Sequence, residues 1–388
     1  MPHKSIRLKA KEGRRARAGA PWIFSNEVEM SNIAKALAPG SLVNVLGDDG
    51  RVFGTGYFNS KSLIAVRLLD AAADAAIDSN FFAGRFARAA ALRESFYDKP
   101  YYRLVHSEGD GLPGLAIDRF DDVFVVQITT AGMEALLDPI TAALQSVFKP
   151  SRIILRNDTP ARALEGLESY VKGDGARISL EENGVRYFAD PSGGQKTGWY
   201  YDMRDNRAFM ASLAKGKTVL DAYCFSGGFA LAAAKAGAKD VTAIDSSAPA
   251  LALGEEAATA NRVSAKFVKA DVMEELERLW AAKKSFDIVI ADPPPFVKSK
   301  KDLEPGAKAY RKLARLAASV TAKDGFLLLA SCSHNIPLDR FSAECAAGIS
   351  RSGRKAALIR QTGAGCDHPV HPSLPESAYL KVIVYALD

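Results

Sequence analysis

The feature that constrains the fold most is the regular alternation, after Gly198, of short apolar runs with segments of helical period. Strand-length runs separated by helices are typical of βαβ units, which assemble into a mostly parallel, doubly wound sheet. The apolar runs lie at 218–220, 241–244, 265–268, 288–290 and 326–329. Ligands of such sheets bind beyond the carboxyl ends of the strands, so functional residues are expected there.

The chain before Gly198 has a different pattern and predicts two further domains. Short apolar runs separated by turn signals such as Pro39-Gly40 are typical of a small all-β barrel. Helical spacing over 80–96 then gives way to several strands, with Asn183-Gly184 predicting a hairpin. A chain of 388 residues exceeds one usual core. We therefore expect a barrel at 1–75, an α+β domain at 76–190 and an α/β domain at 191–388.

Composition bounds the partners and the compartment. The net charge is +6, and basic residues cluster at 4–17 and at 298–315. Basic clusters favour polyanions, although two solvated basic faces would look the same. No apolar run is long enough for a membrane span, and charges near the N-terminus argue against a secretory leader. The four cysteines lack paired spacing, so we expect a cytoplasmic protein with neither a disulfide framework nor a metal site.

Acidic residues at consecutive strand ends indicate the ligand. Asp221 ends the first strand of the α/β domain, and a turn with paired glycines then opens a helix. A carboxylate there would repel a dinucleotide pyrophosphate but suits the ammonium of a methionine moiety, which favours S-adenosylmethionine (SAM) over NAD. Asp245 could bind both ribose hydroxyls, and Asp271 the adenine amino group. Each acid taken singly is alternatively a helix cap. The expected donor-pocket residues here are Asp221, Phe225, Ser226, Gly227, Asp245, Ser246, Asp271, Val272, Asp292 and Pro293.

The fourth strand ends in Asp292, followed by three prolines and Phe296. A carboxylate followed by prolines predicts a rigid, non-helical rim beside the donor. Phe296 could stack on a base extracted from its RNA stack. A proline turn that only ends a strand is the alternative.

The segment after the fifth strand contains the candidate nucleophile, Cys332. Carbon 5 of a pyrimidine accepts a methyl group only after a thiolate has added at carbon 6, and Cys332 would lie on the same rim as Asp292. The alternative is a buried, inert cysteine. His334 could lower the thiol pKa or be an ordinary loop residue. Asp292 or a bound water could accept the proton from carbon 5.

At these residues the chain resembles the ribosomal large subunit RNA methyltransferase I family, whose members make 5-methylcytosine in large ribosomal RNA. The resemblance covers essentially the whole chain. It rests on motifs at 67–69, 106–115, 194–207, 225–229, 292–294 and 331–333. The glutamine-lysine-threonine-glycine stretch at 195–198, joined to Asn206-Arg207, is the most specific of them. Pro295 and Phe225-Ser226 depart from the residues common in the family.

The resemblance implies a fold and roles for individual residues. The N-terminal barrel would be an RNA-binding PUA domain, followed by the α+β domain and a Rossmann-like SAM methyltransferase domain. Gln195 and Thr197 would lie at the donor pocket, and Cys332 would be the catalytic thiol. The expected partner is large-subunit ribosomal RNA, and a homodimer is suggested. The methylated nucleotide stays open.

Two other functions remain compatible with the sequence. One is a base amino-group methyltransferase that holds an exocyclic amine with the 292–296 segment and leaves Cys332 without a chemical role. The other is a non-catalytic RNA-binding module in which the sheet serves only as a scaffold.

Overall fold

The computed structural model describes residues 2–191, 193 and 197–388. Contacts divide the chain into two compact units. The first comprises the residues up to Ile178, together with Asp190–Trp199 and Cys366–Ser377. The second comprises Ser179–Ala189, Tyr200–Gly365 and Ala378–Asp388. The finer division into three domains at 75 and 190 stays a proposal.

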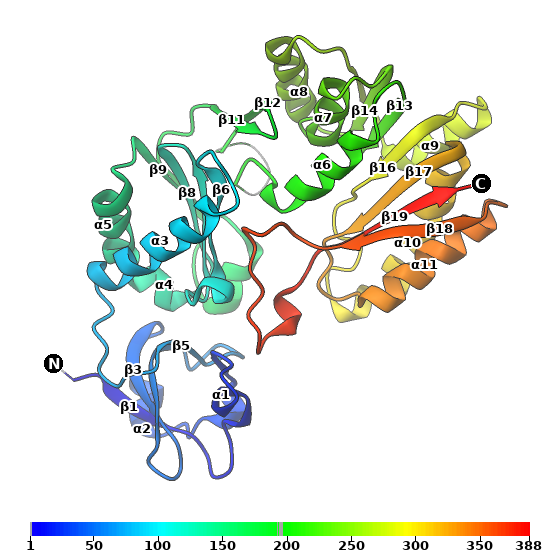
Figure 1. Ribbon diagram of the computed structural model, residues 1–388. Helices are drawn as coiled ribbons and strands as arrows, with labels where there is room; N and C mark the ends of the chain where they lie inside the picture. Colours follow the sequence, from blue (N-terminus) through cyan, green and yellow to red (C-terminus); the bar gives the residue numbers. More distant parts are fainter. Residues whose placement is uncertain (1, 192, 194–196) are drawn as a thin grey trace. The chain divides into compact units, whose positions relative to one another are not determined.

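The N-terminal part of the first unit is a small β structure (Figure 1). Its five strands in the described residues follow the order β1-β3-β4-β5-β2. They are β1 (Lys4–Arg7), β2 (Trp22–Ile23), β3 (Ser41–Leu46), β4 (Val52–Phe58) and β5 (Val66–Asp70), with helices α1 (Arg14–Arg17) and α2 (Asn32–Ala36). The apolar run over 63–69 predicts one strand, but β5 begins only at Val66, after a turn in which Asn59 accepts a hydrogen bond from the amide of Lys61 (3.0 Å).

The rest of the first unit is an α+β layer. Its sheet has the order β10-β9-β8-β7-β6, and helices α3 and α5 pack against each other and share its core. The elements are α3 (Ser79–Glu94), β6 (Tyr101–His106), β7 (Leu115–Phe120), β8 (Val123–Ile128), α4 (Ala131–Ala135), α5 (Leu137–Phe148), β9 (Arg152–Asn157) and β10 (Tyr170–Lys172). The helical spacing over 133–148 predicts one helix, but the structure has two, with the break at Leu136. Pro139, which suits only a first helical turn, explains why a new helix starts there.

The second unit is built on a seven-stranded sheet of order β15-β14-β13-β16-β17-β19-β18 in the described residues. The pairs from β15 to β17 are parallel, whereas β19 runs antiparallel to both β17 and β18. The strands are β13 (Thr218–Ala222), β14 (Asp240–Asp245), β15 (Lys266–Lys269), β16 (Phe286–Ala291), β17 (Thr321–Ser331), β18 (Ala356–Thr362) and β19 (Lys381–Leu387). The expected α/β sheet is thus confirmed.

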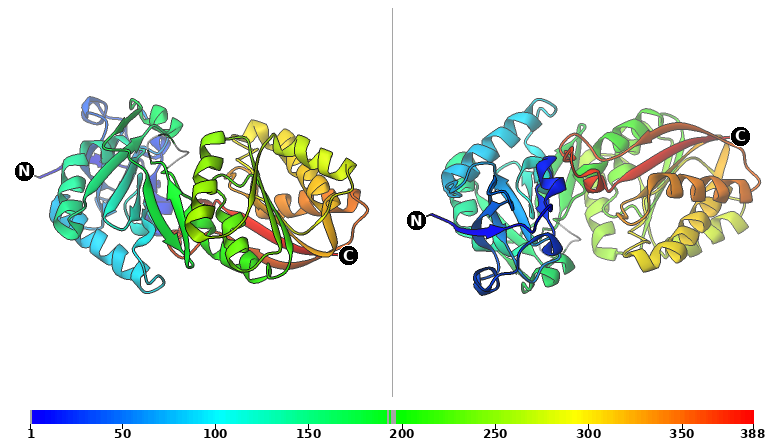
Figure 2. Two further views of the ribbon diagram at one scale, coloured as in Figure 1. Left: turned by 90° about the horizontal axis from the view of Figure 1, so that it is seen from above. Right: turned by 90° about the horizontal axis from the view of Figure 1, so that it is seen from below.

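Helices cover both faces of this sheet, as Figure 2 shows from above and below. Alternate strand residues point to opposite faces. Leu220, for example, packs with α9, α10 and α11, while Val219 packs with α6, α7 and α8. These helices are α6 (Arg204–Ser212), α7 (Gly228–Lys235), α8 (Ala248–Asn261), α9 (Val272–Ala281), α10 (Leu303–Ser319) and α11 (Leu338–Arg351). Two buried faces are what a doubly wound sheet requires.

A hairpin precedes this sheet in the chain. Strands β11 (Ile178–Glu182) and β12 (Val185–Ala189) pair through the expected Asn-Gly turn. Asn183 (φ 52°) and Gly184 (φ 76°) both adopt the left-handed conformation that such a turn needs. The hairpin contacts α8, where the side chain of Asn261 exchanges hydrogen bonds with the backbone of Arg186 (2.6 and 2.9 Å). In the described residues, no helix is long and apolar enough to cross a membrane.

The barrel and the α+β layer meet where α4 packs on Tyr57 of β4. This tyrosine is 1% exposed, and its hydroxyl donates to the carbonyl oxygen of Pro113 (2.7 Å). A Cβ atom at Gly132 would lie 2.0 Å from Cγ of that ring. Only glycine therefore lets the helix approach so closely.

We expect Gly132→Ala to destabilise the protein by about 1 to 3 kcal/mol, because the added methyl group overpacks a rigid contact. Gly84→Ala is the matched control, since Gly84 is an exposed glycine of α3 with no atom within 4 Å of the added Cβ. That control should gain about 0.5–1 kcal/mol from helix propensity. Urea unfolding of both variants measures the difference; equal stabilities would contradict the packing argument.

Candidate active site

Four candidate residues lie at the carboxyl ends of neighbouring parallel strands. Asp221 lies in β13, Asp245 ends β14, Asp292 follows β16, and Cys332 follows β17. The registers place Ala222 beside both Ile244 and Ala291. All four residues therefore share one edge of the sheet, centred where the strand order reverses between β13 and β16.

Two carboxylates hold the turn that follows β13. Oδ2 of Asp221, which is 1% exposed, accepts a hydrogen bond from the amide of Ala230 in the first turn of α7 (2.8 Å). Asp245 accepts from the amide of Phe225 (2.9 Å) through Oδ2 and from that of Ser247 (2.8 Å) through Oδ1. The acids at the first two strand ends thus fix the backbone of the glycine turn.

The same turn has an unusual backbone. Tyr223 (φ 64°) and Phe225 (φ 52°) are left-handed, as is Gly227 (φ 79°). This conformation costs an ordinary residue about 1–3 kcal/mol and is concentrated at functional sites. A Cβ atom at Gly227 would also lie 2.9 Å from the ring of Phe267. The turn is consequently strained and tightly packed.

Two buried polar atoms of this turn have no hydrogen-bond partner in the described residues: Oδ1 of Asp221 and Oγ of Ser226. Burial raises the pKa of Asp221 to about 8; the amide of Ala230 opposes the shift, and the Asp292 carboxylate adds to it. Unpartnered buried polar groups are rare. A cationic ligand with hydrogen-bonding groups would satisfy both atoms and favour the ionised acid. The residues therefore fit SAM.

The other predicted donor-pocket residues surround this turn less closely. Asp271 is exposed and caps α9 by accepting from the amide of Glu274 (3.1 Å), as the helix-cap alternative anticipates. Val272 and Pro293 are buried, and Ser246 is exposed. Their contacts with a donor stay predictions.

Thr197 belongs to the first unit. It is 1% exposed, and its hydroxyl donates to the carboxylate of Asp118. Gln195 lies outside the described residues. The roles of both residues in the donor pocket stay predictions.

A hydroxyl network holds the loop that carries Cys332. The Tyr310 hydroxyl of α10 is bonded to Oγ of Ser331 (2.8 Å) and to Oγ of Ser333 (2.9 Å). Oγ of Ser333 also accepts from the amide of Val297, just beyond the proline rim (3.2 Å). Cys332 itself is partly exposed between two buried serines. The network therefore fixes the thiol loop relative to the Asp292 rim.

The remaining cysteines differ from Cys332 in their surroundings. Cys224 and Cys345 are buried, and burial raises the pKa of both thiols, which makes them poor nucleophiles. Cys366 is exposed in the first unit. Cys332 is thus the partly exposed thiol at the functional edge of the sheet.

The aromatic and imidazole candidates pack against protein rings. The Phe296 ring lies 4.8 Å from that of Tyr310, and the exposed His334 ring lies 5.3 Å from that of Tyr379, centroid to centroid. Base stacking by Phe296 and proton transfer by His334 stay predictions.

Sequence reasoning missed Tyr310 and Lys381. Nothing in the sequence distinguishes Tyr310 from other apolar-face residues of its helix. Lys381 does carry a signal, because it is a single charge within the apolar run 379–386. In the structure it is 7% exposed and pairs with Ser331 in the β17–β19 ladder.

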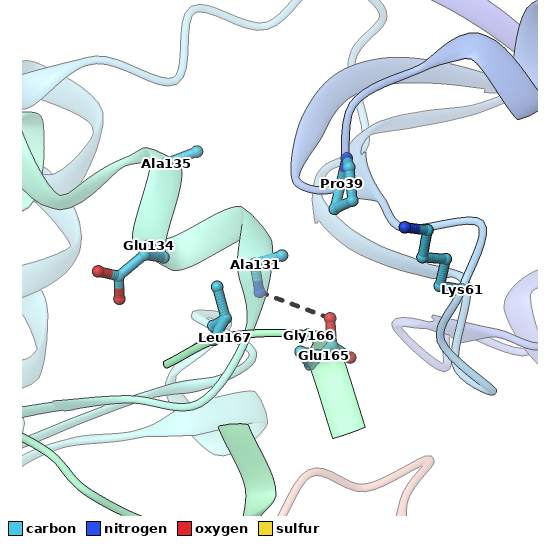
Figure 3. Close-up of a pocket in the computed structure, with 8 residues that line it drawn as sticks. All are labelled: Pro39, Lys61, Ala131, Glu134, Ala135, Glu165, Gly166 and Leu167. Carbon is cyan, nitrogen blue, oxygen red and sulfur yellow. Dashed lines mark hydrogen bonds between the residues drawn. The ribbon is translucent and has the colours of Figure 1, made fainter. Parts of the chain in front are cut away.

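A separate hollow of about 310 Å³ lies between the barrel and α4 in the first unit (Figure 3). Its most buried acid, Glu165, is already engaged by Asn59 (2.9 Å), Ser62 (2.7 Å) and Arg67 (2.9 Å). These hydrogen bonds to the Glu165 carboxylate join the barrel to the α+β layer. We assign the hollow a structural role.

Comparisons with known proteins agree with this geometry. A model of PUA-like domains matches residues 6–71, and a model of S-adenosylmethionine-dependent methyltransferases matches residues 141–356. Two curated relatives, from Shewanella denitrificans and Shewanella amazonensis, are both named Ribosomal RNA large subunit methyltransferase I. Each is 36% identical to this chain over 98% of its length and 99% of the relative's.

Solved structures share the fold at lower identity. A candidate SAM-dependent methyltransferase from Streptococcus mutans aligns with a TM-score of 0.81 and 22% identity, covering 99% of this chain and 100% of that one. A second methyltransferase structure, complexed with SAH (S-adenosylhomocysteine), aligns with a TM-score of 0.83 and 22% identity over 100% of both chains.

The pKa of Asp221 gives a prediction of defined sign. This pKa is about 8 in the folded protein and about 3.9 in the unfolded chain. The folded state therefore favours the protonated acid, and the stability that this gives is lost as the pH rises from the lower pKa to the higher one. Without donor, Asp221→Asn should therefore gain stability relative to wild type as pH rises through this window. Denaturant unfolding at several pH values measures it. The variant should also bind SAM more weakly in calorimetry.

Asp287→Asn is the control of opposite sign. Asp287 lies at the other end of β16, and hydrogen bonds from Thr218 lower its pKa. The stability that ionised Asp287 gives is present above its unfolded pKa and is lost as the pH falls, so the substitution should lower stability at neutral pH. It should leave SAM binding unchanged. A pH-independent difference for Asp221→Asn would contradict the assignment.

Proposed function

Because this chain belongs to the ribosomal RNA large subunit methyltransferase I family, we propose that it methylates carbon 5 of a cytosine in large-subunit ribosomal RNA, with Cys332 as nucleophile. SAM supplies the electrophilic methyl group and leaves as SAH. The observation that carries the proposal is the position of Cys332 on the sheet edge that also bears Asp221 and Asp245. Its two flanking serines hold it there.

The chemistry assigns Cys332 two tasks. Its thiolate adds to carbon 6 of the base, and the displaced electron pair makes carbon 5 nucleophilic enough to take the methyl group. Loss of the proton from carbon 5 then expels the thiolate and restores the aromatic ring. The thiol must therefore be ionised and held still, and the bonds from Tyr310 to both neighbouring serines provide the second requirement.

Asp292 is our candidate for orienting the base or accepting the carbon 5 proton. Burial raises the pKa of Tyr200, and the charges of both Asp292 and Cys332 add to that shift. Asp292 and Cys332 also follow the neighbouring parallel strands β16 and β17 at their carboxyl ends. Asp292 also follows β16 directly, with its amide donating to the carbonyl oxygen of Ala222 (3.4 Å).

RNA as the substrate is supported by two separated features. One is the PUA-like match over residues 6–71. The other is a basic loop, residues 298–301, whose Lys298, Lys300 and Lys301 are exposed just after the proline rim. Asn335 donates to the carbonyl oxygen of Lys298 (3.0 Å), which ties this basic loop to the segment carrying Cys332. Phosphates flanking a target base would meet these cations.

Replacing Cys332 by Ala should abolish 5-methylcytosine formation, because the variant lacks the thiolate that adds to carbon 6. RNA containing 5-fluorocytosine should form a stable covalent adduct with the wild-type protein, because fluorine at carbon 5 is not lost as a proton. Mass spectrometry of RNA nucleosides and of the adduct measures both effects. Cys366→Ala, which changes an exposed thiol in the first unit, should retain activity.

The products of Cys332→Ala also separate the alternatives. Continued methylation of an exocyclic amine would replace our proposal by the amino-group mechanism. Absence of SAM binding by the wild-type protein would favour a non-catalytic RNA-binding module.

Alanine at Lys298, Lys300 and Lys301 together should weaken RNA binding and reduce the salt dependence of log K by about 2 to 3, because each lost phosphate contact removes about one unit of slope. Binding titrations at several salt concentrations measure this. Lys312→Ala is the control, since Lys312 is also half exposed but already pairs with Glu277 (3.0 Å). An unchanged slope in the triple variant would exclude the basic loop as a phosphate contact.

A further inference from the structure

The strand beside the nucleophile begins with a buried lysine. Lys381 opens β19, pairs with Ser331 of β17, and is 7% exposed. Its ammonium donates to the carbonyl oxygens of Ser333 (2.5 Å) and Tyr379 (2.9 Å). The side chain therefore extends from the level of Ser331 to that of Ser333, past the backbone of Cys332. Figure 1 shows β17 and β19 as neighbours in the sheet.

Burying this charged lysine costs free energy of folding. Burial removes the hydration of an ammonium, and carbonyl acceptors replace only part of the interaction that a paired anion would give. Within the described part of the chain, the contacts of Lys381 include two carbonyl oxygens and no carboxylate. A lysine has three N–H donors, so one remains for another acceptor.

Cys332, whose backbone the lysine side chain passes between the levels of Ser331 and Ser333, is the ionisable group that acts on this lysine. Burial lowers the pKa of Lys381, and the Cys332 charge opposes that shift. The other titratable groups around the thiol are Tyr310 of α10, Tyr200 before α6, Asp292 of the rim and His334 of the same loop. Burial raises the pKa of both tyrosines, so at neutral pH they are uncharged donors.

The chemistry needs a cation at this position. An ordinary thiol has a pKa of about 8.5 and is only a few per cent thiolate at pH 7. A neighbouring ammonium is the usual means of raising that thiolate fraction.

We propose that Lys381 is a positioning residue that stabilises the Cys332 thiolate and fixes the loop carrying it. This assignment rests on the proposed function and explains how the Cys332 thiol is ionised. In its neutral form the lysine amine accepts the thiol proton, giving an ammonium–thiolate pair with no net gain or loss of charge. The thiolate attacks carbon 6 from that pair, and the ammonium stabilises it again when it leaves.

The direct test is the rate of Cys332 alkylation by iodoacetamide as a function of pH, resolved by peptide mass spectrometry. In the wild-type protein, the midpoint for Cys332 should lie below that of the exposed Cys366, measured in the same digests. Lys381→Met and Lys381→Gln should raise the Cys332 midpoint by about one unit or more. Glutamine keeps an N–H donor for the loop carbonyls but carries no charge. A raised Cys332 midpoint in this variant therefore reports the loss of the lysine charge.

Lys355→Met is the matched control. It removes the same charge from an exposed site beside Asp388, just beyond the far end of β19, and should leave the Cys332 midpoint unchanged. In methylation assays, the acidic limb of the kcat profile should move upward with the thiol midpoint in both Lys381 variants. The KM for RNA should stay within about twofold.

The outcomes separate this inference from the proposed function. An unchanged midpoint in Lys381→Gln overturns the inference even if Cys332 proves essential for methylation. A shifted midpoint supports it even if the product is not 5-methylcytosine. If both Lys381 variants fail to fold, the wild-type protein decides: a Cys332 midpoint at or above that of Cys366 overturns the proposal.

Discussion

The site depends on the hydrogen bonds that two aspartate side chains accept from backbone amides of the glycine turn and of the helix that follows it. Asp221 binds the amide of Ala230, and Asp245 binds that of Phe225. A hydrogen bond contributes about 0.5–1.5 kcal/mol, or about 1.5–3 kcal/mol where one partner is charged, and the left-handed Tyr223 and Phe225 cost about 1–3 kcal/mol each. Without a ligand, the pKa of about 8 keeps Asp221 protonated at neutral pH, so its bond has the smaller value and the two bonds offset the strain only in part. A ligand that satisfies Oδ1 of Asp221 then adds stability where the two bonds leave part of the strain.

The sequence predicts the α/β order well because periodicity is a local property. Once strands and helices alternate, their carboxyl ends must share one edge, and this fixes the neighbourhood of Asp221, Asp245, Asp292 and Cys332. Periodicity alone does not predict the helix break at Leu136, because Pro139 fits the helical spacing of its neighbours and yet requires a first helical turn.

What the sequence could not supply are contacts between distant segments. Lys381 donates a hydrogen bond to the carbonyl oxygen of Ser333, which lies 48 residues earlier in the sequence. Ser331 donates one to the hydroxyl of Tyr310, which lies 21 residues earlier. No local pattern encodes such pairs, since they follow only from the strand order. Helix capping and ligand binding by Asp221 do not exclude each other, because Oδ2 caps α7 while Oδ1 has no hydrogen-bond partner in the described residues.

Charge is distributed along the functional edge in a way that suits two oppositely charged substrates. The carboxylates Asp221 and Asp245 lie at β13 and β14, where a cationic donor would bind. The cations Lys381 and the basic loop lie on the other side of β16, toward β17 and β19, where an anionic RNA would approach. Were the two sets interleaved, they would neutralise each other and leave neither substrate with a complementary field. Asp292 stands at the boundary between them, directly after β16, so the reacting carbon and methyl group would meet where the two fields join.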